Sequence, residues 1–222
     1  MKKRFARIIA LICLVLALVF ATACQKESAT LPGKEELKSN EELYSLSPEE
    51  AMAALGLSES DLVETEERPE AWLPQIDNFP PEAQAEALPL KIISLDPTRE
   101  LLAGYSFNEA LVFEPPASGD GWMFGGIEYS LQEDDPEQLA ALAEALLEEA
   151  KLAYGGMMTS HGFPRLSEEG IFDKIKNGTS GIWKEDWDIA KKTILTLTVS
   201  YSEEGGFISM FSHVLGSGIY SS

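Results

Sequence analysis

Hydrophobic residues follow two different periods in the C-terminal part of the chain. In residues 122–131 and 195–201 they alternate with polar residues, which is typical of strands that bury one face. Shorter apolar runs at 91–95 and 110–113, and a last run at 207–215, are further strand candidates. Residues 136–154 instead repeat leucine and alanine every three to four positions, which predicts an amphipathic helix.

The residues that flank this helical stretch define its ends. Asp135 is placed to cap the N-terminus, Pro136 fits the first turn, and Gly155 with Gly156 ends the helix. The order over residues 90–222 is therefore strand, strand, long helix, strand, strand. This β-β-α-β-β order predicts an α+β domain, in which an antiparallel sheet carries one long helix packed on a face, in two layers.

Residues 47–89 precede this domain and are predicted to form a short helical and proline-rich segment. Ser47 can cap a helix that begins with Pro48, and Gly56 supplies its end. The prolines that follow interrupt any period, so most of the remaining segment is predicted to be loop.

The N-terminus has the pattern of an export signal. Four basic residues lie within the first seven positions, residues 8–23 carry no charge, and small residues precede Cys24. The run Ala21-Thr22-Ala23-Cys24 resembles the lipobox of bacterial lipoprotein precursors. The resemblance covers about a tenth of the chain and departs from the family at Ala21, where leucine is usual.

The resemblance implies that residues 1–23 are a signal peptide and that Cys24 is lipidated. The lipid would anchor the protein in the cell membrane or outer membrane, facing outward from the cytoplasm. A plain secretory signal and an uncleaved transmembrane anchor are the two alternatives, although the apolar run is short for a spanning helix. Residues 24–46 lack an apolar period and are predicted to be a flexible tether.

Charge and cysteine content exclude several classes of function. The net charge of −20 argues against a nucleic-acid partner, because such binding needs a basic surface. Cys13 would leave with the signal and Cys24 would be acylated, so the mature domain would have no disulfide or thiolate zinc site. The acidic residues also lack the spacing of a calcium loop. We therefore expect neither a metal site nor a cofactor.

No residue pattern predicts a catalytic centre. His161 and His213 are the only histidines, and neither belongs to a recognisable triad or nucleophile elbow. His213 is expected on a strand face, toward solvent or neighbouring residues. Residues 185–188 are expected to be a solvated acidic turn. A pair of carboxylates of the glycosidase type stays open, because the sequence does not give their separation in space.

Aromatic residues are the remaining candidates for a functional surface, namely Trp122, Phe124, Trp183 and Trp187. They either form a second small core under the proline-rich segment or line an exposed patch for a protein or carbohydrate partner. The sequence thus predicts a membrane-anchored lipoprotein with a binding or assembly role and, more weakly, no enzymatic activity. The alternative is a cell-envelope hydrolase that uses carboxylates.

Overall fold

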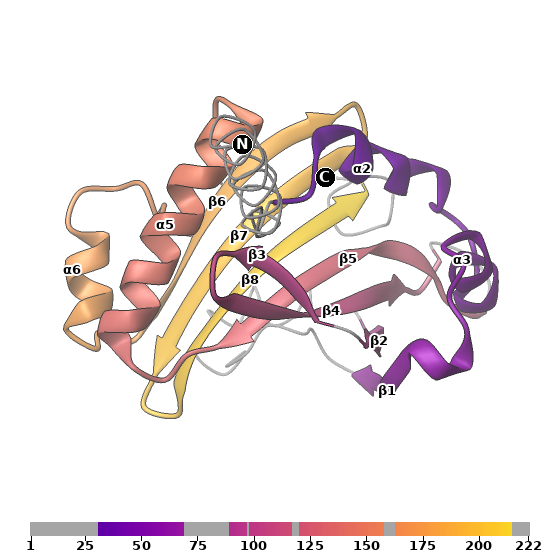
Figure 1. Ribbon diagram of the computed structural model, residues 1–222, viewed down its shortest axis with the longest axis horizontal. Coiled ribbons are helices and arrows are strands. Elements are labelled where there is room, and N and C mark those ends of the chain that lie inside the picture. Colours follow the sequence, from indigo (N-terminus) through magenta and orange to yellow (C-terminus); the bar gives the residue numbers. More distant parts are fainter. Residues whose placement is uncertain (1–30, 69–88, 97, 117–119, 158–162, 215–222) are drawn as a thin grey trace, which may run out of the picture. The chain divides into compact units, whose positions relative to one another are not determined.

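The computed structural model describes residues 31–68, 89–96, 98–116, 120–157 and 163–214 (Figure 1). The chain divides into two compact units, residues 1–30 and 31–222, and all of the described residues belong to the second. This unit is an α+β domain with an antiparallel sheet and one long helix packed against it, so the predicted fold class is confirmed.

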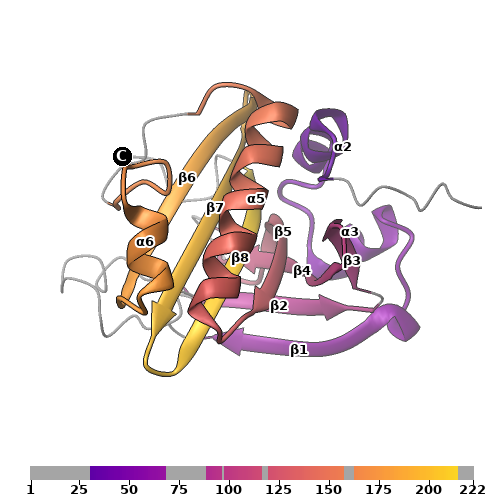
Figure 2. The same cartoon turned by 60° about the vertical axis from the view of Figure 1, so that its left-hand side comes forward.

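The sheet has eight strands, and every pair of neighbours is antiparallel. Seven strands lie side by side in the order β1-β2-β4-β5-β8-β7-β6, while the short β3 pairs only with β4. Figure 2 shows that the sheet twists strongly, since β1 and β2 run at a steep angle to β6 and β7. In chain order the strands are β1 (Leu62–Arg68), β2 (Leu90–Leu95), β3 (Arg99–Leu102), β4 (Tyr105–Glu114), β5 (Met123–Gln132), β6 (Gly181–Ala190), β7 (Thr193–Ser202) and β8 (Gly205–Val214).

The long helix α5 (Pro136–Tyr154) forms as its flanking residues predict. Asp135 Oδ1 accepts hydrogen bonds from the backbone N–H groups of Glu137 and Gln138, at 2.8 and 3.2 Å. Its buried face, which includes Leu139, Leu142 and Leu146, packs in the main core over β6, β7 and β8. Figure 2 shows the helix lying across these strands. A second, short helix, α6 (Ile171–Lys176), packs beside α5.

The N-terminal part contains helices α2 (Lys34–Ser39) and α3 (Pro48–Ala54) and the 3-10 turns Asn40–Glu42 and Glu59–Asp61. The start of α3 is confirmed, because Ser47 and Glu50 each accept a hydrogen bond from the other's backbone N–H. The expected tether is wrong from Leu31 to Leu46. Leu37 of α2 is buried in the main core, which anchors these residues to the domain.

Strand β1 also differs from the prediction, which placed no strand before residue 90. Its residues pair with all of β2, from Leu62 opposite Leu95 to Arg68 opposite Leu90. The predicted boundary between residues 89 and 90 therefore separates two strands of one sheet. Hydrophobic alternation is absent from β1 because it is an edge strand with acidic residues.

A β-bulge in β5 changes which residues face the core. The register of β4 and β5 shifts between Val112 and Phe113, which leaves Gly125 as the extra residue. Regular alternation would put positions 124 and 129 on opposite faces, but the bulge places both Phe124 and Tyr129 in the main core. Gly126 is needed here, because a Cβ atom would lie 2.1 Å from the carbonyl oxygen of Ser212.

Candidate functional site

The aromatic candidates do not form an exposed patch, which was one of the two alternatives for them. Phe124, Trp183 and Trp187 are 0%, 4% and 0% exposed, and all three belong to the core under the helices. Trp122 is half-buried and packs against the same core. Their burial follows from strand alternation in β6 and from the bulge in β5, which direct these rings to the helix-covered face. Cys24 lies outside the described residues.

A cleft on the other face of the sheet, opposite α5, is the best candidate site. It has a volume of about 430 Å³ and extends over β1, β2, β4, β5 and β8. Glu64, Glu66 and Glu128 contribute carboxylates, whereas Ile92, Ala110 and Phe207 contribute apolar surface. A volume of this size suits a small ligand or a few side chains of a larger partner.

Strand alternation places these side chains on one face. Glu64 lies opposite Ser94 in the β1–β2 register, and Glu66 lies opposite Ile92. Glu128 lies opposite Ala110 on β4. Because paired residues point to the same side of a sheet, these side chains share the face that α5 does not cover.

The rim of the cleft contains an exposed hydrophobic residue. The β1–β2 register shifts between Leu62 and Glu64, so Val63 is left without a direct partner on β2. Its side chain is 67% exposed and lines the cleft. Val63 therefore adds apolar contact area at the edge of the sheet, where a partner can reach it.

The lining of the cleft in the described structure is acidic. None of the residues that line it in the described structure is lysine or arginine. The nearest cation along β2, Lys91, pairs with Glu67 at 3.3 Å, and Glu67 does not line the cleft. Low-dielectric walls around several carboxylates concentrate the negative potential, which attracts cations and repels anions.

A buried acid–base pair lies at one end of the same face. His213 Nε2 is 3.2 Å from Glu114 Oε1, and the side chains are 2% and 1% exposed. Phe211 stacks on the imidazole, with ring centroids 5.5 Å apart. His213 is on a strand face as expected, but it contacts neighbours rather than solvent. Both side chains are therefore shielded from solvent.

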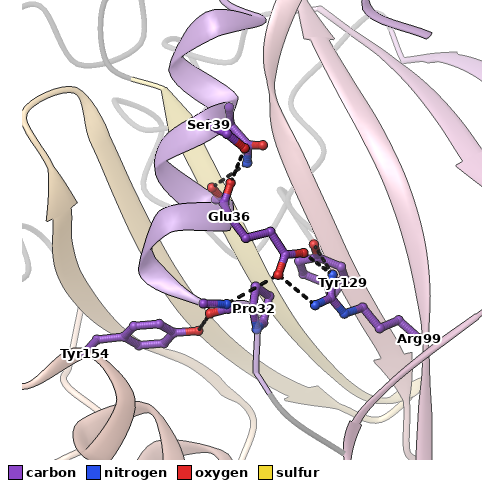
Figure 3. Close-up of polar contacts among 9 residues, drawn as sticks. Pro32, Glu36, Ser39, Arg99, Tyr129 and Tyr154 are labelled. Atoms are coloured by element: carbon purple, nitrogen blue, oxygen red, sulfur yellow. Dashed lines mark hydrogen bonds and ion pairs between the residues drawn. The ribbon is translucent and has the colours of Figure 1, made fainter. Parts of the chain in front are cut away.

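A second polar cluster attaches α2 to the sheet (Figure 3). Both Nη atoms of Arg99 donate hydrogen bonds to the Glu36 carboxylate, and Arg99 also donates to the Tyr129 hydroxyl at 3.3 Å. These hydrogen bonds hold the pKa of Glu36 below its usual value. Tyr154 of α5 donates to the Pro32 carbonyl at 2.8 Å. The mutual pairing of these groups identifies the cluster as an attachment point for the N-terminal helix.

Burial changes the other pKa values in this cluster. The pKa of Glu109 is raised, chiefly because burial penalises its charged form, and Arg99 opposes that shift. Burial likewise raises the pKa of Tyr129 and of Tyr154. Both phenols therefore stay neutral at physiological pH, so they serve as hydrogen-bonding groups of this attachment rather than as bases.

The expected acidic turn at residues 185–188 is also wrong, because these residues lie inside β6. Glu185 is fully buried and accepts hydrogen bonds from Arg165, at 2.8 Å from Nε, and from the backbone N–H of Ser167 at 3.1 Å. Asp186 accepts a hydrogen bond from Thr196 at 2.7 Å. These hydrogen bonds hold the segment that contains Arg165 and Ser167 against β6, at the edge of the sheet.

Two further properties concern metals and membranes. Within the described ranges, no three His, Cys, Asp or Glu side chains are grouped so as to hold a metal ion. The helices of those ranges also lack the combination of length and apolar character that is needed to cross a bilayer.

The sequence analysis did not identify Glu64 and Glu66 because it did not predict strand β1, which carries them. Glu64 and Glu66 are separated by Thr65, so β1 has polar residues on both faces and no hydrophobic period. Glu128 lies in a strand that the sequence did predict, but its neighbours across the sheet come only from strand pairing. A short stretch of alternating acids and β-branched residues was the available signal for this edge strand.

Comparison of the chain with family models, with curated proteins and with solved structures found no match.

Proposed function

We propose that this protein is a membrane-anchored bacterial lipoprotein whose domain is a non-enzymatic binding module, with the cleft on the open sheet face as its ligand site. The ligand would carry positive charge on apolar stems. One observation supports this choice above the others: Glu64, Glu66 and Glu128 surround an apolar floor in a cleft of about 430 Å³.

The chemistry of the cleft favours lysine-like groups. An ammonium group on a four-carbon stem can reach the carboxylates while its methylene groups cover Ile92 and Phe207. Such contacts combine burial of apolar surface with charge pairing at the rim. The net charge of the chain, −20, would also increase the rate at which a cationic partner approaches.

The lipid anchor at Cys24 would keep this module close to the membrane. Six residues separate Cys24 from Leu31, the first described residue of the domain, so even an extended chain spans only roughly 25 Å. The partner would therefore also be a component of the membrane surface or its immediate surroundings.

Binding can be tested on the full-length protein in a neutral detergent. The probe is a seven-residue peptide, blocked at both ends, with lysine at every second position and threonine between. We expect calorimetry to detect its binding, at least tenfold weaker binding to the double variant Glu64→Gln/Glu66→Gln, and weaker binding at high salt because salt screens charge pairs.

Two controls define the site. Glu144→Gln removes one exposed charge on α5, far from the cleft face, and should bind as tightly as the unmodified protein. A peptide with glutamate in place of lysine should not bind. Equal affinity for both peptides, or no loss in the double variant, would contradict the proposed site.

The anchor has its own test. Cys24→Ser should move the protein out of the membrane fraction or leave an unprocessed precursor, because no thiol would remain to be acylated. Mass spectrometry of the membrane-bound protein should find acyl chains on an N-terminal Cys24. An unmodified mature N-terminus at another residue would exclude the anchor without affecting the binding test.

A further inference from the structure

We propose that the ligand of the cleft is an extended basic segment of a partner protein that joins the sheet as an additional strand along the outer edge of β1. This inference rests on the proposed function and specifies its partner class. Strand addition supplies affinity through main-chain hydrogen bonds, while alternate side chains supply specificity.

The two edges of the sheet differ in a way that favours this proposal. At β6, the residues before α6 cover the outer edge: the N–H of Lys184 donates to the Pro164 carbonyl, and the N–H of Leu166 donates to the Lys184 carbonyl, both at 3.1 Å. At β1, no strand in the described part of the chain pairs with the outer edge. Among the described residues, one edge is thus covered by the protein itself, whereas the outer edge of β1 pairs with no other strand.

The charge of β1 determines which kind of strand fits. Its seven residues include Glu64, Glu66 and Glu67, and this density of acid repels a second copy of the same edge. A basic strand is attracted instead. Self-association through β1 is therefore disfavoured, whereas a lysine- or arginine-bearing segment is complementary.

Strand geometry aligns the basic side chains with the cleft. Alternate residues of a strand point to the same face and are roughly 6.6 Å apart along it, as Glu64 and Glu66 are on β1. A basic residue at every second position of the added strand would therefore lie beside these two acids in turn. The same side chains would extend toward the apolar floor around Ile92, while Val63 contacts the end of the segment.

Backbone methylation distinguishes strand addition from other modes of binding. The lysine–threonine peptide is prepared in two N-methylated forms, one methylated on the lysines and one on the threonines. Alternate N–H groups of an edge strand point toward and away from the sheet, so only one form loses its hydrogen bonds to β1. We expect at least tenfold weaker binding for one form and binding within about twofold of the parent for the other.

The outcomes separate the two proposals. Equal affinity of both methylated forms and the parent would overturn strand addition but leave the cleft as the binding site. No binding of the parent peptide would overturn the ligand chemistry itself. Hydrogen exchange adds a second measurement: the bound peptide should slow amide exchange in β1 by more than tenfold and leave β6 unchanged. Concentration-dependent dimerisation that Glu64→Gln/Glu66→Gln abolishes would identify a second copy as the occupant and contradict the proposal.

Discussion

The two faces of the sheet are built by the same strands but have different chemistry. On β7, Leu195, Leu197 and Val199 point to α5, and the residues between them point to the opposite face, namely Thr196, Thr198 and Ser200. The face under α5 belongs to one large apolar core. Among the described residues, the opposite face has a smaller apolar cluster, formed by Leu90, Ile92, Ala110, Val112 and Phe211.

The two faces therefore differ in how much apolar surface they bury. The side under α5 buries large rings and leucines, which provide most of the stabilisation that a domain of this size needs. The other side carries hydroxyls, carboxylates and the cleft, which bury less apolar surface and which we propose for ligand binding. Substitutions on the two faces should therefore affect different measurements.

The largest expected loss of stability comes from a tryptophan on the side of α5. Trp187 is fully buried and its ring lies 6.1 Å from that of Tyr154, centroid to centroid. Trp187→Ala should lower the free energy of unfolding by about 3–5 kcal/mol, because it leaves a large cavity. Urea denaturation followed by circular dichroism measures this. A nearly unchanged stability would mean that the ring is not part of the core.

Truncating a buried leucine of α5 should cause the next largest loss of stability. Leu146 is buried in the core, so Leu146→Ala should cost roughly 2–5 kcal/mol in thermal or urea unfolding. Glu144→Ala, on the exposed side of the same helix, should stay within about 0.5 kcal/mol of the original stability. Equal effects of the two substitutions would show that the helix packs with another face.

On the face opposite α5, one substitution should raise the free energy of unfolding instead of lowering it. The hydroxyl of Thr198 is buried and has no hydrogen-bond partner within the described part of the chain. Thr198→Val keeps the shape and removes the polar atom, so the free energy of unfolding should rise by about 1 kcal/mol. Leu197→Thr at the neighbouring core position should be destabilising. A loss of stability in Thr198→Val would imply that the hydroxyl is hydrogen-bonded.

The contribution of the Glu36–Arg99 pair to the free energy of unfolding should depend on pH. The pKa of Glu36 is lowered from 4.5 by its hydrogen bonds with Arg99, so its contribution is complete above pH 4.5 and is lost as the pH falls through the folded-state pKa. Glu36→Gln should therefore be less stable than the original protein at pH 7, by about 0.5 kcal/mol, and equally stable in strong acid. Urea titrations at pH 7 and in increasingly strong acid test this, and a difference that did not shrink as the pH falls below 4.5 would contradict it.

The smallest effect on stability is expected in the cleft. Glu64→Gln lies on an exposed edge strand and should change the free energy of unfolding by less than about 0.5 kcal/mol. The same substitution should weaken binding of the lysine–threonine peptide. If Glu64→Gln bound the peptide normally but lost stability, Glu64 would belong to the folding core and not to the binding site.

The sequence predicted the elements whose signals are local. The cap at Asp135, the helical period of α5 and the alternation in β7 depend only on neighbouring residues, and each element formed at the expected positions. The fold class followed from their order. The buried position of Phe124 did not, because it depends on Gly125 and the register shift against β4.

The candidate site lay largely beyond prediction from the sequence. Glu64 and Glu128 are 64 positions apart, and they line one cleft only because β2 and β4 bring β1 close to β5. Trp183 and Trp187 were left open as core or surface, because their burial depends on the strand that carries them and on which face α5 covers.

By itself, therefore, the sequence determined the long helix, the strands with hydrophobic alternation, the excess of acid and the lipobox-like run at Cys24. The tertiary structure decided the order of strands, the buried position of the tryptophans and the pairing of Arg99 with Glu36. Local hydrogen bonds and side-chain periods are encoded within a few residues. Strand pairing and burial depend instead on contacts between distant segments, which form only when the whole sheet and its helix assemble.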